Sequence, residues 1–241
     1  MISLFPQHGP ADAGAYDDLR LRELVPPTRP YVAVNMVMSV DGQARLGADS
    51  SQLGNETDLA LLLALRNQVD CVVAGTATIA AERYKGPSAG EQSIRRREAA
   101  GLRPRPLFAT ITRSGKVDTS IPLFADAGTE AIVFSAAADL DFSSCAAHVA
   151  VEPVVDAAAV LRTLQHSYGV HTVLLEGGPR LAGAFFAADL VDELFLMVAP
   201  LLAGGVDPFT IVGAELPRQG QLHLHSALLD EDHLFLRYRV D

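Results

Sequence analysis

The 241-residue sequence has only two cysteines, and it has no apolar run near the roughly 20 residues that a membrane-spanning helix needs. Cys71 lies inside an apolar run, which indicates a core thiol, and Cys145 has no partner at metal-ligand spacing. The first residues lack a basic stretch followed by an apolar core, so we expect no secretory signal. Together these absences favour a reducing, cytoplasmic setting.

The chain is also short of positive charge, with a formal net charge of −10. This balance argues against a nucleic-acid surface. Between Lys85 and Lys116, however, eight cations stand against only Glu91 and Glu98. A local basic patch in an acidic protein indicates one small anionic ligand, although we expect Arg95–Arg97 to form a solvated loop.

The seven histidines do not predict a metal site. His223 and His225 share a strand face but have no third ligand nearby in sequence, and no H-E-x-x-H motif occurs. We expect solvated or hydrogen-bonded histidines and no bound metal.

Alternating apolar runs and helical patterns predict an α/β fold with a mainly parallel sheet flanked by helices. Hydrophobic residues make up 49% of the chain, which is ample for a packed core. We expect residues 1–27 to be an N-terminal leader with a short polar helix near 15–24, and residues 28–241 to be a single domain. The last runs lack intervening helices and predict an antiparallel C-terminal edge. The expected strands are 31–39, 71–74, 107–112, 131–135, 148–151, 173–175, 193–199, 222–229 and 234–240, and the expected helices are 59–66, 76–83, 157–168 and 181–188.

The segment 172–184, TVLLEGGPRLAGA, is the most informative part of the chain. A buried strand ends at Glu176, turns through Gly177 and Gly178, and opens a helix at Pro179. Such a turn offers free backbone N–H groups and the positive helix end to a phosphate, and a Cβ in the turn would block a close approach. This is not the G-x-G-x-x-G fingerprint, and a tight βα turn that binds nothing is the alternative.

Ligands of open parallel sheets lie beyond the carboxyl ends of the strands. The predicted strand ends are Ser39, Gly75, Thr112 and Glu176, and small or polar residues follow each of them. We therefore expect these ends to contribute to one ligand site.

Five motifs follow one another along the chain: residues 35–42 (NMVMSVDG), 65–78 (LRNQVDCVVAGTAT), 176–183 (EGGPRLAG), 190–194 (LVDEL) and 199–205 (APLLAGG). In this order and spacing they give the chain a resemblance to a known family. From about Pro30 to Val240 it resembles the C-terminal reductase domain of riboflavin-biosynthesis deaminase/reductases and their stand-alone pyrimidine reductase relatives. The resemblance implies a dihydrofolate-reductase-like fold and, since no Cys/His zinc motif is present, the reductase half alone.

The resemblance implies an NADPH-dependent oxidoreductase that acts on a pyrimidine or pterin-like molecule, and it implies a homodimer. We expect Arg113, with Ser114 beside it, to bind the 2′-phosphate of NADPH, because a planar guanidinium suits a dianionic phosphate. An exposed turn residue is the alternative for Arg113. The expected cofactor-binding residues are Thr78, Glu82, Thr112, Arg113, Ser114, Gly177, Gly178, Pro179, Arg180, Leu181, Ala182 and Gly183.

The resemblance places Asp41, Ser50 (or Ser51), Arg66 and Glu176 at substrate-binding positions. Asp41 and Glu176 are also the candidate catalytic residues, because a carboxylate at a strand end accepts hydrogen bonds from amino and ring N–H groups. Either carboxyl can hold a raised pKa in a closed, dry pocket and relay a proton. A turn-forming Asp and a Glu that binds backbone N–H groups are the structural alternatives.

One segment departs from the family pattern. Relatives that make riboflavin carry an arginine for the substrate 5′-phosphate in this segment, whereas residues 83–87 of this chain, RYKGP, have no arginine in the matching place. Lys85 offers a point charge without the bidentate fork of arginine. Dihydrofolate or another pterin is therefore a second candidate substrate, with Tyr84 available for stacking, and a non-catalytic NADPH-binding protein is a third hypothesis.

Overall fold

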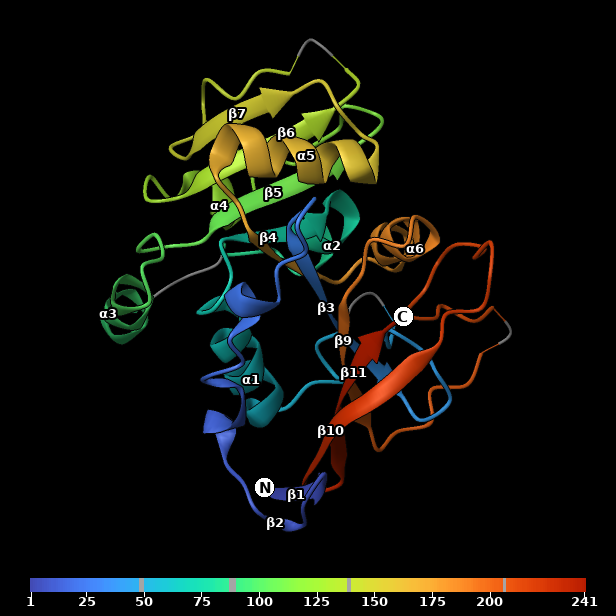
Figure 1. Ribbon diagram of the computed structural model, residues 1–241. Coiled ribbons are helices and arrows are strands. Elements are labelled where there is room, and N and C mark those ends of the chain that lie inside the picture. Colours follow the sequence, from blue (N-terminus) through green and yellow to red (C-terminus); the bar gives the residue numbers. More distant parts are fainter. Residues whose placement is uncertain (48–49, 87–89, 138–139, 206) are drawn as a thin grey trace. The chain divides into compact units, whose positions relative to one another are not determined.

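The computed structural model describes residues 1–47, 50–86, 90–137, 140–205 and 207–241 (Figure 1). The chain divides into two compact units, which are described separately below. Unit 1 comprises residues 1–19, 32–65 and 175–241, and unit 2 comprises residues 20–31 and 66–174.

Unit 1 is built on strands in the order β2-β1-β10-β11-β9-β3. The late strands pair in the antiparallel sense, β10 with β11 and β11 with β9, whereas β3 and β9 pair in parallel. This confirms the antiparallel C-terminal edge that the sequence predicts. The strands are β1 (Ile2–Phe5), β2 (Gly9–Pro10), β3 (Tyr31–Ser39), β9 (Glu193–Ala199), β10 (Leu222–Asp230) and β11 (His233–Val240), and the helices are η1 (Ala13–Tyr16), α1 (Glu56–Arg66) and α6 (Pro179–Ala187).

A buried ion pair lies inside the unit 1 sheet. Glu193 of β9 is 0% exposed, and Arg237 of β11 donates to both of its carboxylate oxygens, with the shortest distance 2.7 Å. A bidentate pair of this kind satisfies two charges that would otherwise be costly to bury. The pair therefore joins β9 to β11 through side chains as well as through the backbone.

Helix α1 begins where the sequence predicts a cap. The side chain of Asn55 accepts a hydrogen bond from the backbone N–H of Asp58 over 2.8 Å. Burial raises the pKa of the Asp58 carboxyl to about 6. This carboxyl is therefore costly to ionise in the folded protein.

Unit 2 holds four parallel strands in the order β4-β5-β6-β7. Together with the β3–β9 pair they confirm the mainly parallel α/β fold. The strands are β4 (Cys71–Gly75), β5 (Leu107–Thr112), β6 (Glu130–Ser135) and β7 (His148–Glu152), and the helices are η2 (Leu21–Leu24), α2 (Thr76–Ala81), α3 (Glu91–Ala99), α4 (Pro122–Ala125) and α5 (Ala157–Tyr168). The residues of β8 (Thr172–Glu176) divide between the two units.

Helix α5 illustrates how local signals set the bounds of an element. Asp156 caps its first turn by accepting from the N–H of Ala159, and Gly169 ends it in the left-handed conformation at φ 69°. Val160, Leu161 and Leu164 form its buried face. The expected bounds of this helix are confirmed.

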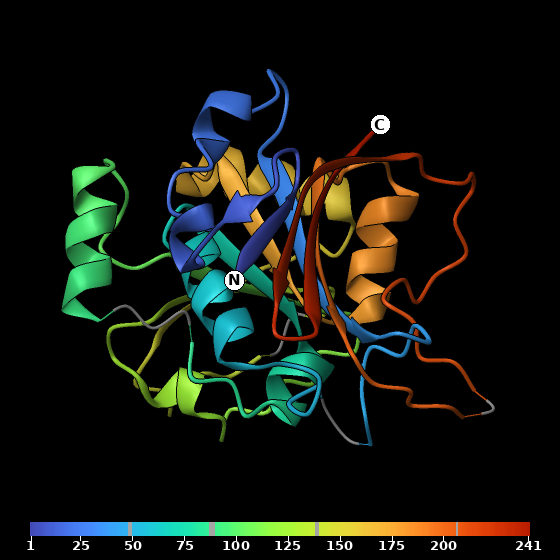
Figure 2. The same cartoon turned by 90° about the horizontal axis from the view of Figure 1, so that it is seen from below.

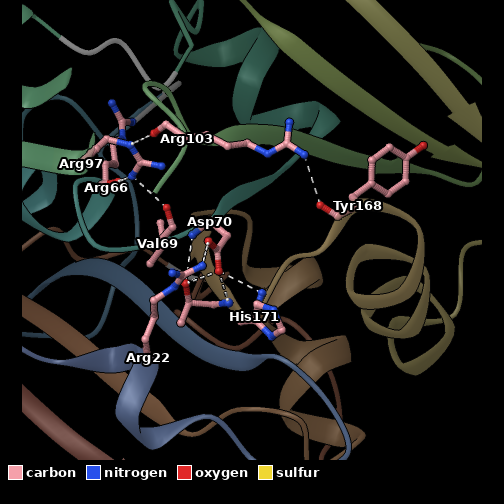
Figure 3. A network of polar contacts seen from close by, with 9 residues as sticks. Arg22, Arg66, Val69, Asp70, Arg97, Arg103, Tyr168 and His171 are labelled. Atoms are coloured by element: carbon pink, nitrogen blue, oxygen red, sulfur yellow. Dashed lines mark hydrogen bonds and ion pairs between the residues drawn. The ribbon is translucent and has the colours of Figure 1, made fainter. Parts of the chain in front are cut away.

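The expected solvated loop at Arg95–Arg97 is wrong. These residues lie in α3, and the side chain of Arg97 is 0% exposed. Arg97 donates to the main-chain carbonyls of Arg66, Val69 and Arg103 over 2.7 to 2.9 Å (Figure 3). Three carbonyl acceptors offset the cost of burying the guanidinium, which composition alone does not reveal.

The first 27 residues carry more structure than the expected leader with one polar helix. Two 3₁₀ helices take the place of that helix, and β1 pairs with β10. In unit 1 the ring of Tyr16 lies 5.2 Å from that of Phe195. In unit 2 Arg22 donates to Asp70 over 2.8 Å (Figure 3). The division into a leader and one domain at residue 28 stays a prediction.

Candidate functional site

The turn between β8 and α6 has the geometry that the sequence predicts. Gly177 and Gly178 adopt positive φ angles of 60° and 80°, where a side chain would be strained. Pro179 takes the first helical position, so the first backbone donors of the helix belong to Arg180 and Leu181. The strand, turn and helix start thus form a potential anion-binding site in unit 1.

Two of the predicted cofactor residues on α6 have packing roles in the structure. Ala182 is 0% exposed, and its N–H donates to the carbonyl of Gly178 over 2.9 Å. A Cβ on Gly183 would lie 2.6 Å from the Cβ of Ala214. Glycine is therefore required at position 183 by the close approach of the loop that carries Ala214.

Asp41 lies in the turn after β3, and its carboxylate accepts three hydrogen bonds from other residues of unit 1. Its Oδ1 accepts from the hydroxyl of Ser39 over 2.5 Å and from the N–H of Ala203 over 3.0 Å. Its Oδ2 accepts from the N–H of Gly204 over 2.6 Å. These bonds lower the pKa of Asp41 to about 2, the Ser39 hydroxyl being the largest cause. The raised pKa expected of this carboxyl is wrong, because the expectation assumed a dry pocket instead of three donors.

The structure also assigns a role to a residue that the sequence reasoning missed. Gln43 is 9% exposed, and its Oε1 accepts from the N–H of Phe209 over 2.8 Å. The backbone of Gln43 exchanges hydrogen bonds with Ser39, which closes the turn around Asp41. The sequence gives only a weak signal for this role, because a glutamine two residues after Asp41 does not indicate a hydrogen-bond partner 166 residues away.

Glu176 and Ser50 both belong to unit 1. Glu176 is the last residue of β8 and is 6% exposed. The carbonyl of Ser50 accepts from the N–H of Leu53 over 2.9 Å, which forms a turn before α1. Their roles toward a substrate stay predictions.

Arg66, the last residue of α1, belongs to unit 2. Its Nη2 donates to the hydroxyl of Tyr84 over 2.5 Å, and its guanidinium carbon lies 5.2 Å from the Tyr84 ring centre. The Tyr84 ring also lies 5.5 Å from that of Phe108. Tyr84 therefore orients Arg66 as well as offering an aromatic face. Lys85 is exposed, and Pro87 lies outside the described residues.

The other predicted cofactor residues also lie in unit 2. Thr112 is the buried last residue of β5. Its hydroxyl lies 3.5 Å from the hydroxyl of Ser114, and either group can be the hydrogen-bond donor. Arg113 between them is exposed. Thr78 lies in α2, and Glu82 follows that helix, its N–H donating to the carbonyl of Thr78 over 2.9 Å.

The structure thus groups the predicted residues by unit. Asp41, Ser50, Glu176 and the start of α6 belong to unit 1, whereas Arg66, Thr78, Glu82 and residues 112–114 belong to unit 2. That the two sets hold one cofactor and one substrate stays a prediction.

Within the described ranges, no three His, Cys, Asp or Glu side chains are grouped to hold a metal ion. None of the helices in this part of the chain is long and apolar enough to cross a membrane.

Comparison with known proteins gives matches over most of the chain. A family model described as the RibD C-terminal domain matches residues 30–234. A 2,5-diamino-6-ribosylamino-4(3H)-pyrimidinone 5′-phosphate reductase of Methanothermobacter thermautotrophicus is 28% identical over 193 residues, which cover 78% of this chain and 85% of that relative. The protein of the same name from Aquifex aeolicus is 28% identical over 198 residues, covering 78% and 84%.

Solved structures share the fold. A pyrimidine reductase-like protein of Corynebacterium diphtheriae matches with a TM-score of 0.81 at 21% identity, over 96% of this chain and 99% of that one. The riboflavin biosynthesis reductase Rib7 of Saccharomyces cerevisiae matches with a TM-score of 0.68 at 17% identity, over 90% and 92%. The dihydrofolate-reductase-like architecture expected from the sequence is confirmed.

Proposed function

Because this chain belongs to the RibD C-terminal domain family, we propose that it is an NADPH-dependent reductase of a pyrimidine intermediate of riboflavin biosynthesis. The family match over residues 30–234 is the observation that carries this function. The reductase names of the curated relatives support it further. Membership of a reductase family implies a nicotinamide cofactor.

The start of α6 fits the phosphates of such a cofactor. Arg180 and Leu181 offer backbone N–H groups at the positive end of a nine-residue helix, and the turn before them carries no side chain on Gly177 or Gly178. NADPH, in preference to NADH, is supported by Arg113, whose exposed guanidinium follows a buried strand end. Among the described residues, Arg113 has no ion pair.

The bound nicotinamide supplies a hydride, and the chain supplies binding and orientation. Glu176, buried at the end of β8, is the candidate to accept hydrogen bonds from the amino and ring N–H groups of the substrate. Arg66, held by the hydroxyl of Tyr84, is the candidate to bind the pyrimidine or its sugar. Asp41 is ionised at neutral pH and does not donate a proton there.

The proposed substrate is the 2,5-diamino-6-ribosylamino-4(3H)-pyrimidinone 5′-phosphate named for the curated relatives, or the corresponding uracil compound. The second candidate is dihydrofolate or a related pterin. It is favoured by the segment 83–86, RYKG, which has no arginine at the position where riboflavin-forming relatives carry the one that binds the phosphate.

Steady-state assays with NADPH and each candidate substrate test the proposal. Turnover of the phosphoribosyl pyrimidine at a higher kcat/KM than dihydrofolate supports the first candidate, and the reverse supports the second. Saturable NADPH binding without turnover of either substrate would favour a non-catalytic NADPH-binding protein.

We also propose a homodimer formed through the late antiparallel strands. β1 pairs with residues 227–229 of β10, so residues 222–226 of this strand have no neighbour on that side within the described chain. An open edge of this kind is a common place for a second copy to pair. Sedimentation at micromolar concentration tests the assembly, and a monomer would contradict it.

A cytoplasmic location fits the two free cysteines.

A further inference from the structure

The segment 201–214, which follows β9, is tied to two other parts of unit 1. It contacts the turn after β3 and the first half of α6. Figures 1 and 2 show the course of its backbone between β9 and β10. Residue 206 lies outside the described residues, so the contacts below concern 201–205 and 207–214. These contacts join the turn that carries Asp41 to the helix start proposed for the cofactor phosphates.

The first set of contacts is made by Asp41. Its carboxylate receives the N–H groups of Ala203 and Gly204 over 3.0 and 2.6 Å, and the N–H of Val40 donates to the carbonyl of Leu201 over 2.9 Å. Gly204 has a φ of 65°, so the backbone there turns in a way that favours glycine. A carboxylate that accepts two successive N–H groups holds this turn through charge-assisted bonds.

The second set involves Phe209. Gln43 accepts from the N–H of Phe209 over 2.8 Å, and the N–H of Ala44 donates to the carbonyl of Phe209 over 2.7 Å. The guanidinium carbon of Arg45 lies 4.0 Å from the centre of the Phe209 ring. Both the backbone and the side chain of Phe209 are thus fixed by the three residues 43–45.

The third set lies on α6. The N–H of Gly213 donates to the carbonyl of Pro179 over 2.8 Å. A Cβ on Gly213 would lie 3.1 Å from the backbone nitrogen of Arg180. Ala214 packs against Gly183 one turn further along the helix. The segment therefore touches the same first turn of α6 that offers N–H groups to an anion.

We propose that Asp41 and Gln43 are positioning residues, which act through the 201–214 segment to fix the first turn of α6 for cofactor binding. The part of this inference that concerns the cofactor rests on the proposed function. Neither residue needs to touch the cofactor, because the segment that they hold through Ala203, Gly204 and Phe209 also contacts the first turn of α6.

Amide hydrogen exchange on the full-length protein tests the mechanical part without any ligand. In Asp41→Asn one carboxylate oxygen becomes an NH₂ group, which cannot accept from Gly204. We expect exchange at Ala203 and Gly204 to accelerate roughly tenfold or more, and exchange at Phe209 to accelerate less. The matched control is Asp141→Asn, since Asp141 also accepts a backbone N–H, that of Ser143, in an exposed turn. Unchanged exchange at 203–204 in Asp41→Asn would overturn the proposal.

Cofactor titration and kinetics test the functional part. We expect Asp41→Asn to raise the dissociation constant of NADPH roughly five- to tenfold and to raise KM for NADPH more than it lowers kcat. The pH dependence of kcat/KM should keep its shape. A proton relay through Asp41 predicts instead a large loss of kcat with unchanged exchange and unchanged NADPH affinity, and this result would overturn the proposal.

A second variant keeps the test decisive if Asp41→Asn does not fold. Gln43→Met keeps the length of the side chain and removes the acceptor for Phe209, so exchange at Phe209 and the NADPH dissociation constant should both rise. If the wild-type protein binds no nicotinamide cofactor, the proposed function fails, while the exchange measurements still decide whether Asp41 and Gln43 hold the segment. If the wild-type protein binds NADPH but neither variant shows faster exchange or weaker NADPH binding, the inference fails while the proposed function stands.

Discussion

Arg97 donates from Nη1 to the carbonyl oxygen of Arg66 over 2.7 Å, although both side chains carry a positive charge. The same Nη1 donates to the carbonyl of Val69 over 2.8 Å, and Nε donates to that of Arg103 over 2.9 Å. Figure 3 shows the three carbonyls converging on one guanidinium. The buried Arg97 thus holds the backbone that follows α1 in place. This backbone includes Arg66, the residue proposed to bind the substrate.

Replacing Arg97 should therefore destabilise unit 2. Arg97→Met keeps the aliphatic stem and leaves three carbonyls without their donor, so we expect a loss of about 3 kcal/mol in the free energy of unfolding. Urea denaturation measures this change. Arg95→Met, on an exposed position of the same helix with a surface ion pair to Glu91, is the control and should change it by less than about 0.5 kcal/mol. Equal effects of the two variants would contradict the role given to Arg97.

Gly183 should not tolerate a methyl group. In Gly183→Ala the new Cβ would lie 2.6 Å from the Cβ and 2.9 Å from the nitrogen of Ala214. We expect the overpacking to cost about 1 to 3 kcal/mol of stability in thermal or urea unfolding. Gly220→Ala is the matched control, because a Cβ there meets nothing within 4 Å. The account of Gly183 is wrong if both variants unfold at the same denaturant concentration.

Asp58 should make stability depend on pH between about 4 and 6. Burial raises its pKa in the folded protein from 3.8 to about 6, so the folded state holds this proton more tightly than the unfolded state. Stability is then greatest below the unfolded pKa and falls as pH rises through the folded pKa. A shift of about two units corresponds to on the order of 3 kcal/mol. Comparing the free energy of unfolding of the wild type and Asp58→Asn at several pH values measures the effect. A constant difference between them across this range would contradict the raised pKa.

Arg113 should discriminate between the two nicotinamide cofactors. Loss of a charge-assisted contact to the 2′-phosphate should cost about 1.5 to 3 kcal/mol, so Arg113→Ala should weaken NADPH binding roughly 10- to 150-fold and leave NADH binding nearly unchanged. Fluorescence titration with each cofactor gives both constants. Arg162→Ala, on the exposed face of α5, is the control. Equal losses for NADPH and NADH would refute the assignment.

Much of the fold could be predicted from the sequence because its signals are local. The bounds of β3, β5, α5 and β9 are confirmed residue for residue, since apolar periodicity, caps and glycines mark their ends. β1, β2, α3 and α4 were missed. Helix α3 is strongly polar, and its only buried residue is an arginine, so no apolar periodicity marks it. β1 depends on pairing with a strand more than 220 residues away, which no local pattern reports.

The candidate site divides in the same way. The turn at Gly177 and Gly178 was predictable, because strand, glycine and proline signals coincide there. The hydrogen bonds of Asp41 were not, because its partners Ala203 and Gly204 donate from the backbone and have no side-chain chemistry to recognise. The glycine at 183 was predictable as a motif, but its cause, the approach of Ala214, is a tertiary contact.

The central claim is most directly tested by the absorbance of NADPH during incubation with the purified protein and 2,5-diamino-6-ribosylamino-4(3H)-pyrimidinone 5′-phosphate. The account predicts oxidation of NADPH that requires both protein and substrate, saturates with each, and is faster than with NADH. A folded protein that oxidises neither cofactor in the presence of this substrate, its uracil counterpart or dihydrofolate would contradict it.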